Sequence, residues 1–446
     1  MSSDTIFAPL TIKGKCSLFV IRISGTRVTE CLKILGVDKD IRTREATHCN
    51  IYYENRVLDS AIIIYFKSPN SFTGEDVVEL DLHCSSYIIN KVYEILLNVD
   101  GVRLATNGEF SKRAFLNGKM DLVEAEAICD LISSETGLQH NQAIKQLLGQ
   151  SSEFFDGLKD EILEISSGIE ALIDFPEDGI EDISISFLEE KIILLKEKIT
   201  NALDENRVGE KIKNGLNVAI IGASNVGKSS FLNFLAGRDA AIVCDIAGTT
   251  RDIIEIKTEI NGLIINVSDT AGIRNSDDFI ENEGIKRSIK TAKDADFKIL
   301  ILDVQHINIE ERIKNLVDNN TLVLLNKIDL LDESEVKKIR KNLNFENDII
   351  EISIKNAINL DRVIEYLGEY VEKNVTSHAD RALSQERHRI ELKKTITYLK
   401  EIDFKQPLEI VAEKIRLATF ALGQITGQIN TEEILDRIFS KFCVGK

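Results

Sequence analysis

The sequence lacks the features that place a protein in a membrane or in a secreted compartment. No stretch reaches the roughly 18 consecutive apolar residues that a membrane-spanning helix needs. Residues 1–9 do not combine a basic segment with an apolar one, so we expect no secretory signal. The seven cysteines are scattered singly, with no Cys-x-x-Cys motif and no Cys/His cluster at zinc spacing. We therefore expect a protein of the reducing cytoplasm without a structural metal.

Positive charge is also scarce. The formal net charge is −18, and it is unevenly distributed: residues 1–119 carry 15 basic and 14 acidic side chains, whereas the remainder carries 40 and 59. A field of this sign repels a polyanion. Any contact with RNA must therefore use a local basic surface or a partner protein.

The 446 residues are too many for one hydrophobic core, and the pattern changes along the chain. Short β-branched runs at 17–23, 61–66 and 77–82 predict strands in an α+β segment. An apolar period of 3.6 residues then predicts helices, one of them with Leu122, Ala125, Ile128, Leu131 and Ile132 on one face. Further along, strands alternate with helices, as in a parallel sheet with crossover helices, before long helices return.

These patterns predict an α+β multidomain protein. We expect an N-terminal α+β domain, a discontinuous helical domain, and an α/β P-loop G domain inserted into the helical one. The predicted segments are 1–119 (N-terminal domain), 120–213 and 375–446 (helical domain), and 214–374 (G domain).

Residues 222–229 read Gly-Ala-Ser-Asn-Val-Gly-Lys-Ser, which fits the phosphate-loop pattern G-x-x-x-x-G-K-[ST]. An apolar run at 218–221 predicts a strand before it, and a helix is predicted from 230. In that context, backbone N–H groups close around phosphates at a helix N-terminus. Lys228 would neutralise charge on the β- and γ-phosphates, and the Ser229 hydroxyl would bind Mg²⁺.

Two more motifs each follow a predicted strand: Asp-Thr-Ala-Gly at 269–272 and Asn-Lys-Ile-Asp at 326–329. Asp269 would hold Mg²⁺ through water, and Gly272 would offer its N–H to a γ-phosphate. The Asp329 carboxylate can accept both N1–H and N2–H₂ of guanine, a donor pair that adenine lacks. Leaving a buried carboxylate unpaired costs roughly 2–5 kcal/mol, so Asp329 would select GTP over ATP.

The residue after Gly272 is Ile273, where many small GTPases carry the Gln that orients the attacking water. An apolar side chain cannot do this. Asn225 could instead offer its carbonyl oxygen to a monovalent cation, and the loop 244–250 could supply backbone carbonyls and bring Thr250 to Mg²⁺. Such a cation would stabilise transition-state charge as an arginine finger does. A solvated loop position for Asn225 stays an open alternative.

Several segments together resemble one family, the MnmE (TrmE) tRNA-modification GTPases. In the G domain these are Asn225, Asp-Ile-Ala-Gly-Thr-Thr-Arg-Asp at 245–252 and Asp-Thr-Ala-Gly-Ile-Arg at 269–274. Outside it, the similar segments are 70–76, 108–117 and the ending Phe-Cys-Val-Gly-Lys at 442–446. The resemblance runs from end to end, and the segments outside the G domain separate it from ribosome-assembly GTPases.

This resemblance implies a homodimer whose N-terminal domain binds folate. It also implies that the protein forms a heterotetramer with the FAD protein MnmG. The pair would install a carboxymethylaminomethyl-type group on C5 of the tRNA wobble uridine. A tetrahydrofolate derivative, 5-formyl- or 5,10-methylene-, would donate the one-carbon unit.

The resemblance also implies roles for individual residues. K⁺ would be held by Asn225 and the carbonyls of Cys244, Ile246 and Thr249, and Mg²⁺ by Ser229 and Thr250. The folate site would use Arg22, Glu79, Lys119 and Lys446. The full nucleotide site would comprise Asn225, Val226, Gly227, Lys228, Ser229, Ser230, Cys244, Asp245, Ile246, Ala247, Gly248, Thr249, Thr250, Asp269, Thr270, Ala271, Gly272, Asn326, Lys327, Ile328, Asp329, Ser353, Ile354 and Lys355.

Two catalytic roles come from the resemblance alone. Glu281 matches the switch glutamate that positions the attacking water through a bridging water; the alternative is a solvated side chain in an acidic loop. Cys443 would be needed for the modification. A buried structural thiol is the alternative for Cys443.

The sequence departs from the family pattern at three places. The loop 9–15 lacks the usual second proline and glycine run, Cys84 and Ser85 stand where two glycines are expected, and Ile354 replaces the usual alanine. Two other functions stay open at this point. One is a regulatory GTPase switch that recruits a ribosomal or signalling partner; the other is a dimer scaffold.

Overall fold

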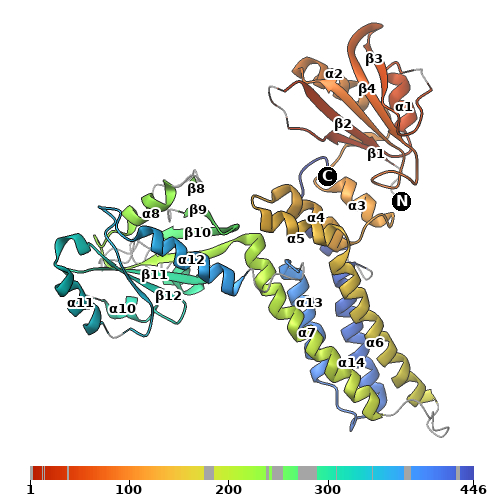
Figure 1. The fold of residues 1–446 in the computed structure, drawn as a ribbon. Coiled ribbons are helices and arrows are strands. Elements are labelled where there is room, and N and C mark those ends of the chain that lie inside the picture. The colour runs from red at the N-terminus through yellow and green to blue at the C-terminus, as the bar shows by residue number, and fades with distance from the viewer. Residues whose placement is uncertain are drawn as a thin grey trace, which may run out of the picture. The chain divides into compact units, whose positions relative to one another are not determined.

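The computed structural model describes residues 4–12, 14, 16–37, 40–174, 185–237, 241–243, 255–269, 289–307, 309–343, 345–375, 383–427 and 432–446. The chain forms two compact units (Figure 1). The first comprises residues 1–129, 146–192 and 397–446, and the second comprises residues 130–145 and 193–396. The predicted boundaries at 119, 213 and 374 stay predictions.

The first unit contains a six-stranded sheet with the strand order β3-β4-β5-β2-β1-β6. β1 runs parallel to β6, and the other neighbours are antiparallel. The three strands predicted in this segment are confirmed, and the second begins earlier than expected, at Arg56. The strands are β1 (Thr5–Pro9), β2 (Leu18–Ser24), β3 (Thr47–Tyr53), β4 (Arg56–Phe66), β5 (Val77–His83) and β6 (Val102–Leu104).

The sheet has two different faces because side chains alternate along each strand. Helices α1 (Val28–Ile34) and α2 (Ser86–Leu97) cover one face. There, Phe19, Ile21 and Leu80 of the strands form one buried cluster with side chains of the two helices. The residues between these, such as Arg22 and Glu79, belong to the opposite face. That face carries a smaller buried cluster, which includes Ile6 and Phe110 and against which the partly buried Phe72 packs.

Two contacts between helices organise the helical part of this unit. α6 (Gln150–Asp174) lies side by side with α14 (Leu408–Thr426), as Figure 1 shows. At its other end, α15 (Glu432–Phe439) packs on α3 (Glu109–Leu116). Leu435, Ile438, Phe439 and Phe442 form one buried cluster with Leu122 and Ala125. The predicted face of α4 (Leu122–Ser133) is therefore confirmed at its start, but it is wrong at Ile132, which is 53% exposed one residue before the helix ends.

The second unit contains a seven-stranded sheet with the order β13-β12-β11-β7-β10-β9-β8. β10, β7, β11, β12 and β13 are parallel to their neighbours in that series, and β9 is antiparallel to β10 and β8. This confirms the predicted α/β P-loop fold. The strands are β7 (Leu216–Ile221), β8 (Ala241–Val243), β9 (Glu255–Ile260), β10 (Leu263–Asp269), β11 (Phe297–Asp303), β12 (Thr321–Asn326) and β13 (Ile349–Glu351).

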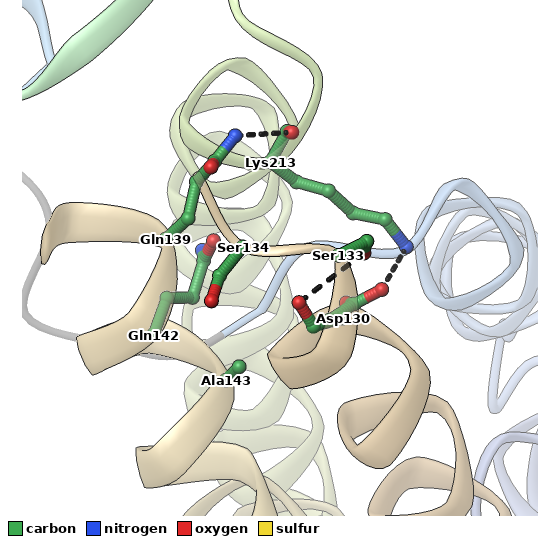
Figure 2. Close-up of a pocket in the computed structure, with 7 residues that line it drawn as sticks. All are labelled: Asp130, Ser133, Ser134, Gln139, Gln142, Ala143 and Lys213. Carbon is green, nitrogen blue, oxygen red and sulfur yellow. Dashed lines mark hydrogen bonds and ion pairs between the residues drawn. The ribbon is translucent and has the colours of Figure 1, made fainter. Parts of the chain in front are cut away.

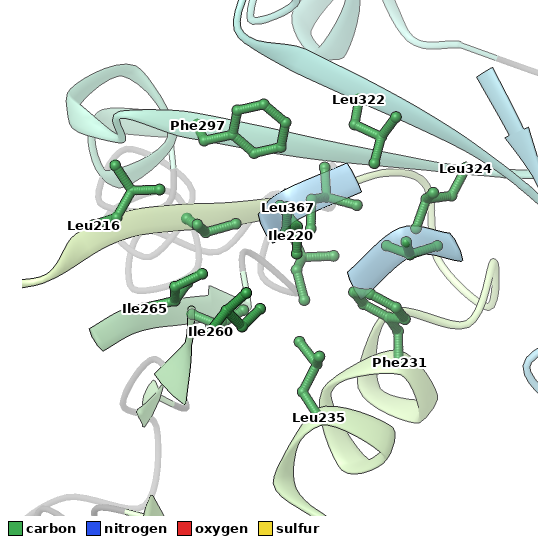
Figure 3. Close-up of a cluster of buried hydrophobic side chains, with 14 of the residues drawn as sticks. Leu216, Ile220, Phe231, Leu235, Ile260, Ile265, Phe297, Leu322, Leu324 and Leu367 are labelled. Carbon is green, nitrogen blue, oxygen red and sulfur yellow. The ribbon is translucent and has the colours of Figure 1, made fainter. Parts of the chain in front are cut away.

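Helices cover both faces of this sheet. On one face, Phe231 and Leu235 of α8 (Lys228–Ala236) and Leu367 of α12 (Leu360–Asn374) pack on the central strands (Figure 3). On the other face lie α10 (Glu311–Lys314) and α11 (Glu333–Asn342). The central strands are buried on both faces, so they read as continuous apolar runs. The unit also contains most of three further helices, α5 (Gly137–Leu147), α7 (Ile185–Asn214) and α13 (Glu386–Lys400).

Among the described residues, no helix is both long enough and apolar enough to cross a membrane.

Candidate functional site

The phosphate-loop motif folds as a strand, a tight loop and a helix. β7 ends at Ile221 and α8 begins at Lys228. Gly222 and Gly227 both have positive φ angles, 153° and 110°. A Cβ atom would lie 2.5 Å from the carbonyl oxygen of Ile301 at the first position, and 2.4 Å from Nδ2 of Asn326 at the second. Only glycine fits both positions without displacing its neighbours.

The side chains of this loop are arranged for an anionic ligand. The Lys228 ammonium donates hydrogen bonds to the carbonyl oxygens of Gly222, at 2.9 Å, and Ala223, at 2.7 Å. The buried charge is therefore held over the loop at the positive end of α8. Asn225, whose φ angle is 63°, and Ser229 are exposed. Their side chains are accessible to a ligand.

The Asn-Lys-Ile-Asp motif lies at the end of β12 and joins this loop to a third segment. Asn326 donates from Nδ2 to the carbonyl of Val226, at 2.7 Å, and accepts from the backbone N–H of Ile354, at 3.2 Å. Asp329 accepts a 2.5 Å hydrogen bond from the Ser353 hydroxyl. The structure thus brings together three of the predicted nucleotide segments, 222–230, 326–329 and 353–355.

For other predicted residues of the nucleotide site, the structure shows a different partner, an exposed side chain or the backbone position alone. Lys327 pairs with Asp303, with 2.6 Å between Nζ and Oδ2, and Lys355 is exposed. The backbone of Asp269 ends β10, paired with Ile220 of β7. The remaining predicted residues lie outside the described residues: Cys244, Asp245, Ile246, Ala247, Gly248, Thr249, Thr250, Thr270, Ala271, Gly272 and Glu281.

A second charged site lies on the N-terminal sheet, on the face away from α1 and α2. Arg22 of β2 stands opposite Glu79 of β5. Its Nε and Nη2 atoms lie 2.9 and 2.7 Å from the same carboxylate oxygen, Oε1. The guanidinium also lies 4.8 Å from the ring centre of Phe72 and 5.7 Å from that of Phe110. Its third nitrogen, Nη1, is buried without a hydrogen-bond partner, which is costly for a charged donor.

The C-terminal segment reaches this second site. The N–H of Phe110 donates to the carbonyl of Lys446, at 3.2 Å, and a Cβ on Gly445 would lie 2.1 Å from the carbonyl oxygen of Pro9. Burial, and then the charge of Arg22, hold the pKa of the Lys446 ammonium below its usual value, while Glu79 acts in the opposite direction. Arg22, Glu79 and Lys446 therefore share one electrostatic environment.

The other two predicted residues of this region have different contacts. Lys119 donates from Nζ to the carbonyl of Pro69, at 3.0 Å, so it contacts the segment that also carries Phe72. Cys443 is exposed. The alternative of a buried structural thiol at Cys443 is therefore wrong, because Phe442, and not Cys443, turns into the core. Sequence reasoning missed Phe72 and Phe110, although both lie in segments that carry the family resemblance.

A small polar cavity in the second unit contains no comparable ligand chemistry. It has room for about one water molecule, at about 20 Å³. Figure 2 shows Lys213, at the end of α7, paired with Asp130, with 2.7 Å between Nζ and Oδ1. Gln139 donates from Nε2 to the Lys213 carbonyl, at 2.9 Å. These bonds fix the chain three residues before β7 begins. The lining residues are Asp130, Ser133, Ser134, Gln139, Gln142, Ala143 and Lys213.

A phosphate loop, an Asn-Lys-x-Asp motif at the end of a neighbouring strand and a doubly covered, mostly parallel sheet together define a P-loop guanine-nucleotide-binding protein.

Comparisons with known proteins identify the group within this class. The family model of the MnmE helical domain matches residues 122–443, and that of the GTP-binding protein TrmE N-terminus matches residues 5–119. The chain is 44% identical to the tRNA modification GTPase MnmE of Rickettsia bellii (strain OSU 85-389) over 455 residues, covering 99% of this chain and all of that one. It is 43% identical to the protein of the same name from Rickettsia canadensis (strain McKiel), with the same coverage.

A similarity to a solved structure is confined to part of the chain. The structure of Aquifex aeolicus Era bound to GDP·AlF4⁻ is 27% identical, covers 34% of this chain and 56% of that one, and has a TM-score of 0.28. The family models and the full-length relatives carry the assignment. The chain belongs to the tRNA modification GTPase MnmE family, and it is a GTP-hydrolysing enzyme.

Proposed function

We propose that this GTPase, as a homodimer and together with the FAD protein MnmG, modifies C5 of the wobble uridine of tRNA. A tetrahydrofolate derivative bound at the N-terminal sheet would supply the one-carbon unit. The observation that carries this proposal is the cluster of Arg22, Glu79 and Lys446, with the buried Nη1 of Arg22 lacking a partner.

The residues of the cluster fit a folate. The Glu79 carboxylate can accept the N–H donors of the pterin ring, and Arg22 and Lys446 can pair with the glutamyl carboxylates. Phe72 lies against the Arg22 guanidinium and offers an aromatic surface to a flat ring. A ligand oxygen near Nη1 of Arg22 would satisfy a donor that the protein leaves unpaired. Lys119 would approach the ligand from the segment that includes Phe72.

At the nucleotide site, we assign the binding of Mg²⁺ to the hydroxyls of Ser229 and Thr250. K⁺ would be held by the side-chain oxygen of Asn225 and the backbone carbonyls of Cys244, Ile246 and Thr249. All of these donors are oxygens, which suits hard cations. Exposure of Asn225 and Ser229 supports this assignment. Bound cations supply positive charge next to the phosphates; Glu281 would hold the attacking water in place.

The proposed chemistry requires tRNA to approach an acidic protein. With a net charge of −18, the chain needs the MnmG partner or a local basic surface to offset repulsion. Cys443 is exposed, and it lies three residues before Lys446, which belongs to the cluster. We assign the thiol of Cys443 to the modification step.

The test is a reconstituted reaction. Purified protein, MnmG, FAD, GTP and KCl are incubated with an unmodified tRNA transcript, and the digested nucleosides are analysed by mass spectrometry. We expect the C5-modified uridine only when a tetrahydrofolate derivative is added. Product formation that does not depend on folate would contradict the proposal. Failure to bind folate at all would favour a regulatory switch.

A further inference from the structure

Two cysteines that are distant in the sequence meet at one end of the N-terminal sheet. Cys16 comes just before β2 and Cys84 just after β5, and these strands pair side by side, with Leu18 opposite His83. The two sulfur atoms are 3.0 Å apart. A disulfide bond is about 2.05 Å long, so bond formation needs the sulfurs to approach by about one ångström.

The backbone around the pair holds both thiols in place. Cys84 Sγ lies 3.2 Å from the carbonyl oxygen of Gly14, and Cys16 Sγ lies 3.3 Å from that of Leu18. The pairing of β2 with β5 already aligns the segments that carry Cys16 and Cys84. The disulfide would therefore form just beyond the last residue pair of these strands, Leu18 and His83. The sheet itself would not need to rearrange.

The pair is accessible to a reagent, unlike other cysteines of the same domain. Cys16 is exposed and Cys84 is partly exposed, whereas Cys31 and Cys49 are buried in the core of the sheet. The Cys16 S–H donates toward Cys84, which lowers the pKa of the Cys84 thiol and raises that of Cys16. Since the thiolate is the nucleophile, Cys84 is the attacking sulfur of the two.

We propose that Cys16 and Cys84 form a redox-active dithiol that is converted to an intramolecular disulfide by low-molecular-weight disulfides such as glutathione disulfide. The Cys84 thiolate attacks one sulfur of the oxidant, forms a mixed disulfide and releases one thiolate. Cys16 then gives its proton to solvent and attacks Cys84 Sγ, and the second thiolate leaves. The protein loses two protons and two electrons, and the oxidant is reduced to two thiols.

The disulfide would join two connections at the same end of the sheet. The β1–β2 connection is held at its other end by the hydrogen bond from Leu10 N–H to the Val20 carbonyl, at 2.8 Å. Oxidation would therefore fix this connection at both ends. In a reducing compartment, a disulfide of this kind is a transient modification that responds to the redox state.

The test uses the full-length protein, reduced and then incubated with a series of glutathione redox buffers. Remaining thiols are blocked with N-ethylmaleimide, and tryptic peptides are mapped by mass spectrometry. We expect a cross-linked peptide pair containing Cys16 and Cys84, lighter by two hydrogen atoms and released by dithiothreitol. The matched control, Cys443→Ser, removes another exposed thiol and should leave this cross-link unchanged.

Single variants separate the proposed disulfide from simple accessibility. Cys16→Ser should trap the mixed disulfide with glutathione on Cys84, because the second thiol is missing. Cys84→Ser should react at Cys16 at least tenfold more slowly, because the more acidic thiol is gone. Separate labelling of the two cysteines in the oxidised wild-type protein, with no cross-linked pair at any buffer potential, would overturn the proposal. Folding of each variant is checked by unchanged GTP binding.

Discussion

Arg22 and Glu79 face one another on paired strands, and two guanidinium nitrogens share one carboxylate oxygen, at 2.9 and 2.7 Å. This arrangement leaves Nη1 of Arg22 buried and without a partner. The two side chains are 13% and 20% exposed, so the pair is shielded from solvent on most sides. We therefore regard this pair as the fixed part of the proposed folate site, to which Lys446 is added by the C-terminal segment.

The first prediction concerns the cation. GTP hydrolysis should be faster in KCl than in NaCl at equal ionic strength, because Ile273 cannot orient water and Asn225 is exposed at the phosphate loop. The test variant is Asn225→Gly, since glycine keeps the positive φ angle of 63° while removing the side-chain oxygen. Its hydrolysis should lose the preference for K⁺. Equal rates of the wild-type protein in both salts would refute the assignment.

The second prediction assigns Glu281 to hydrolysis. Glu281→Ala should lower kcat by about 10²–10⁴, the usual range for a lost general base or water-positioning group. GTP affinity should change little, because the side chain acts near the transition state. Glu283→Ala, two residues further along the same acidic segment, is the control and should retain kcat. Single-turnover rates and nucleotide affinities distinguish the two variants; a collapse of affinity with normal kcat would mean a structural role.

The third prediction concerns base selection. Asp329→Asn should weaken GTP binding by about 30-fold to several thousandfold, the equivalent of 2–5 kcal/mol, because the amide cannot accept both guanine donors. Ser353→Ala should have a smaller effect, because it removes only the 2.5 Å hydrogen bond that orients the carboxylate. Fluorescent-nucleotide titration measures both variants. An Asp329→Asn protein that binds GTP normally would exclude this role.

The fourth prediction follows from the lowered pKa of Lys446. An anionic ligand stabilises the ammonium, so folate binding should raise the pKa of Lys446. At an alkaline pH below 10.5, the usual pKa of a lysine, binding should therefore be accompanied by proton uptake. Folate affinity should therefore fall as pH rises through the lowered pKa of the free protein. Calorimetry in two buffers with different ionisation enthalpies measures the uptake. Lys446→Met should abolish it, and no uptake in the wild-type protein would contradict the assignment.

The phosphate loop was predictable because its rules are local. The positive φ angles of Gly222 and Gly227 and the start of α8 at Lys228 all fall within eight consecutive residues. The contact of Arg22 with Phe72 depends instead on the pairing of β2 with β5 and on the course of the segment before β5. Neither leaves a periodic signal in the sequence. The same limit explains why the meeting of Cys16 and Cys84 was not foreseen.

Helical periodicity predicted the core well only where a partner was available. Leu122 and Ala125 of α4 are buried because α15 supplies Leu435 and Phe439. Ile132 has the same periodicity, yet it is exposed, because the helix ends at Ser133. A repeat along one helix gives the direction of its apolar face but not the extent of the surface that covers it.

The proposed folate site can be tested by isothermal titration of 5-formyltetrahydrofolate into the full-length protein and three variants. Arg22→Met and Lys446→Met each remove one proposed charge partner, and Lys441→Met removes an exposed lysine of the same C-terminal segment as the matched control. A charge-assisted hydrogen bond contributes about 1.5–3 kcal/mol, so the first two variants should bind folate about tenfold to a hundredfold more weakly, with GTP binding unchanged. Lys441→Met should bind as the wild-type protein does. Equal folate affinity in all four proteins, or no folate binding by the wild-type protein, would contradict a folate site formed by Arg22 and Lys446.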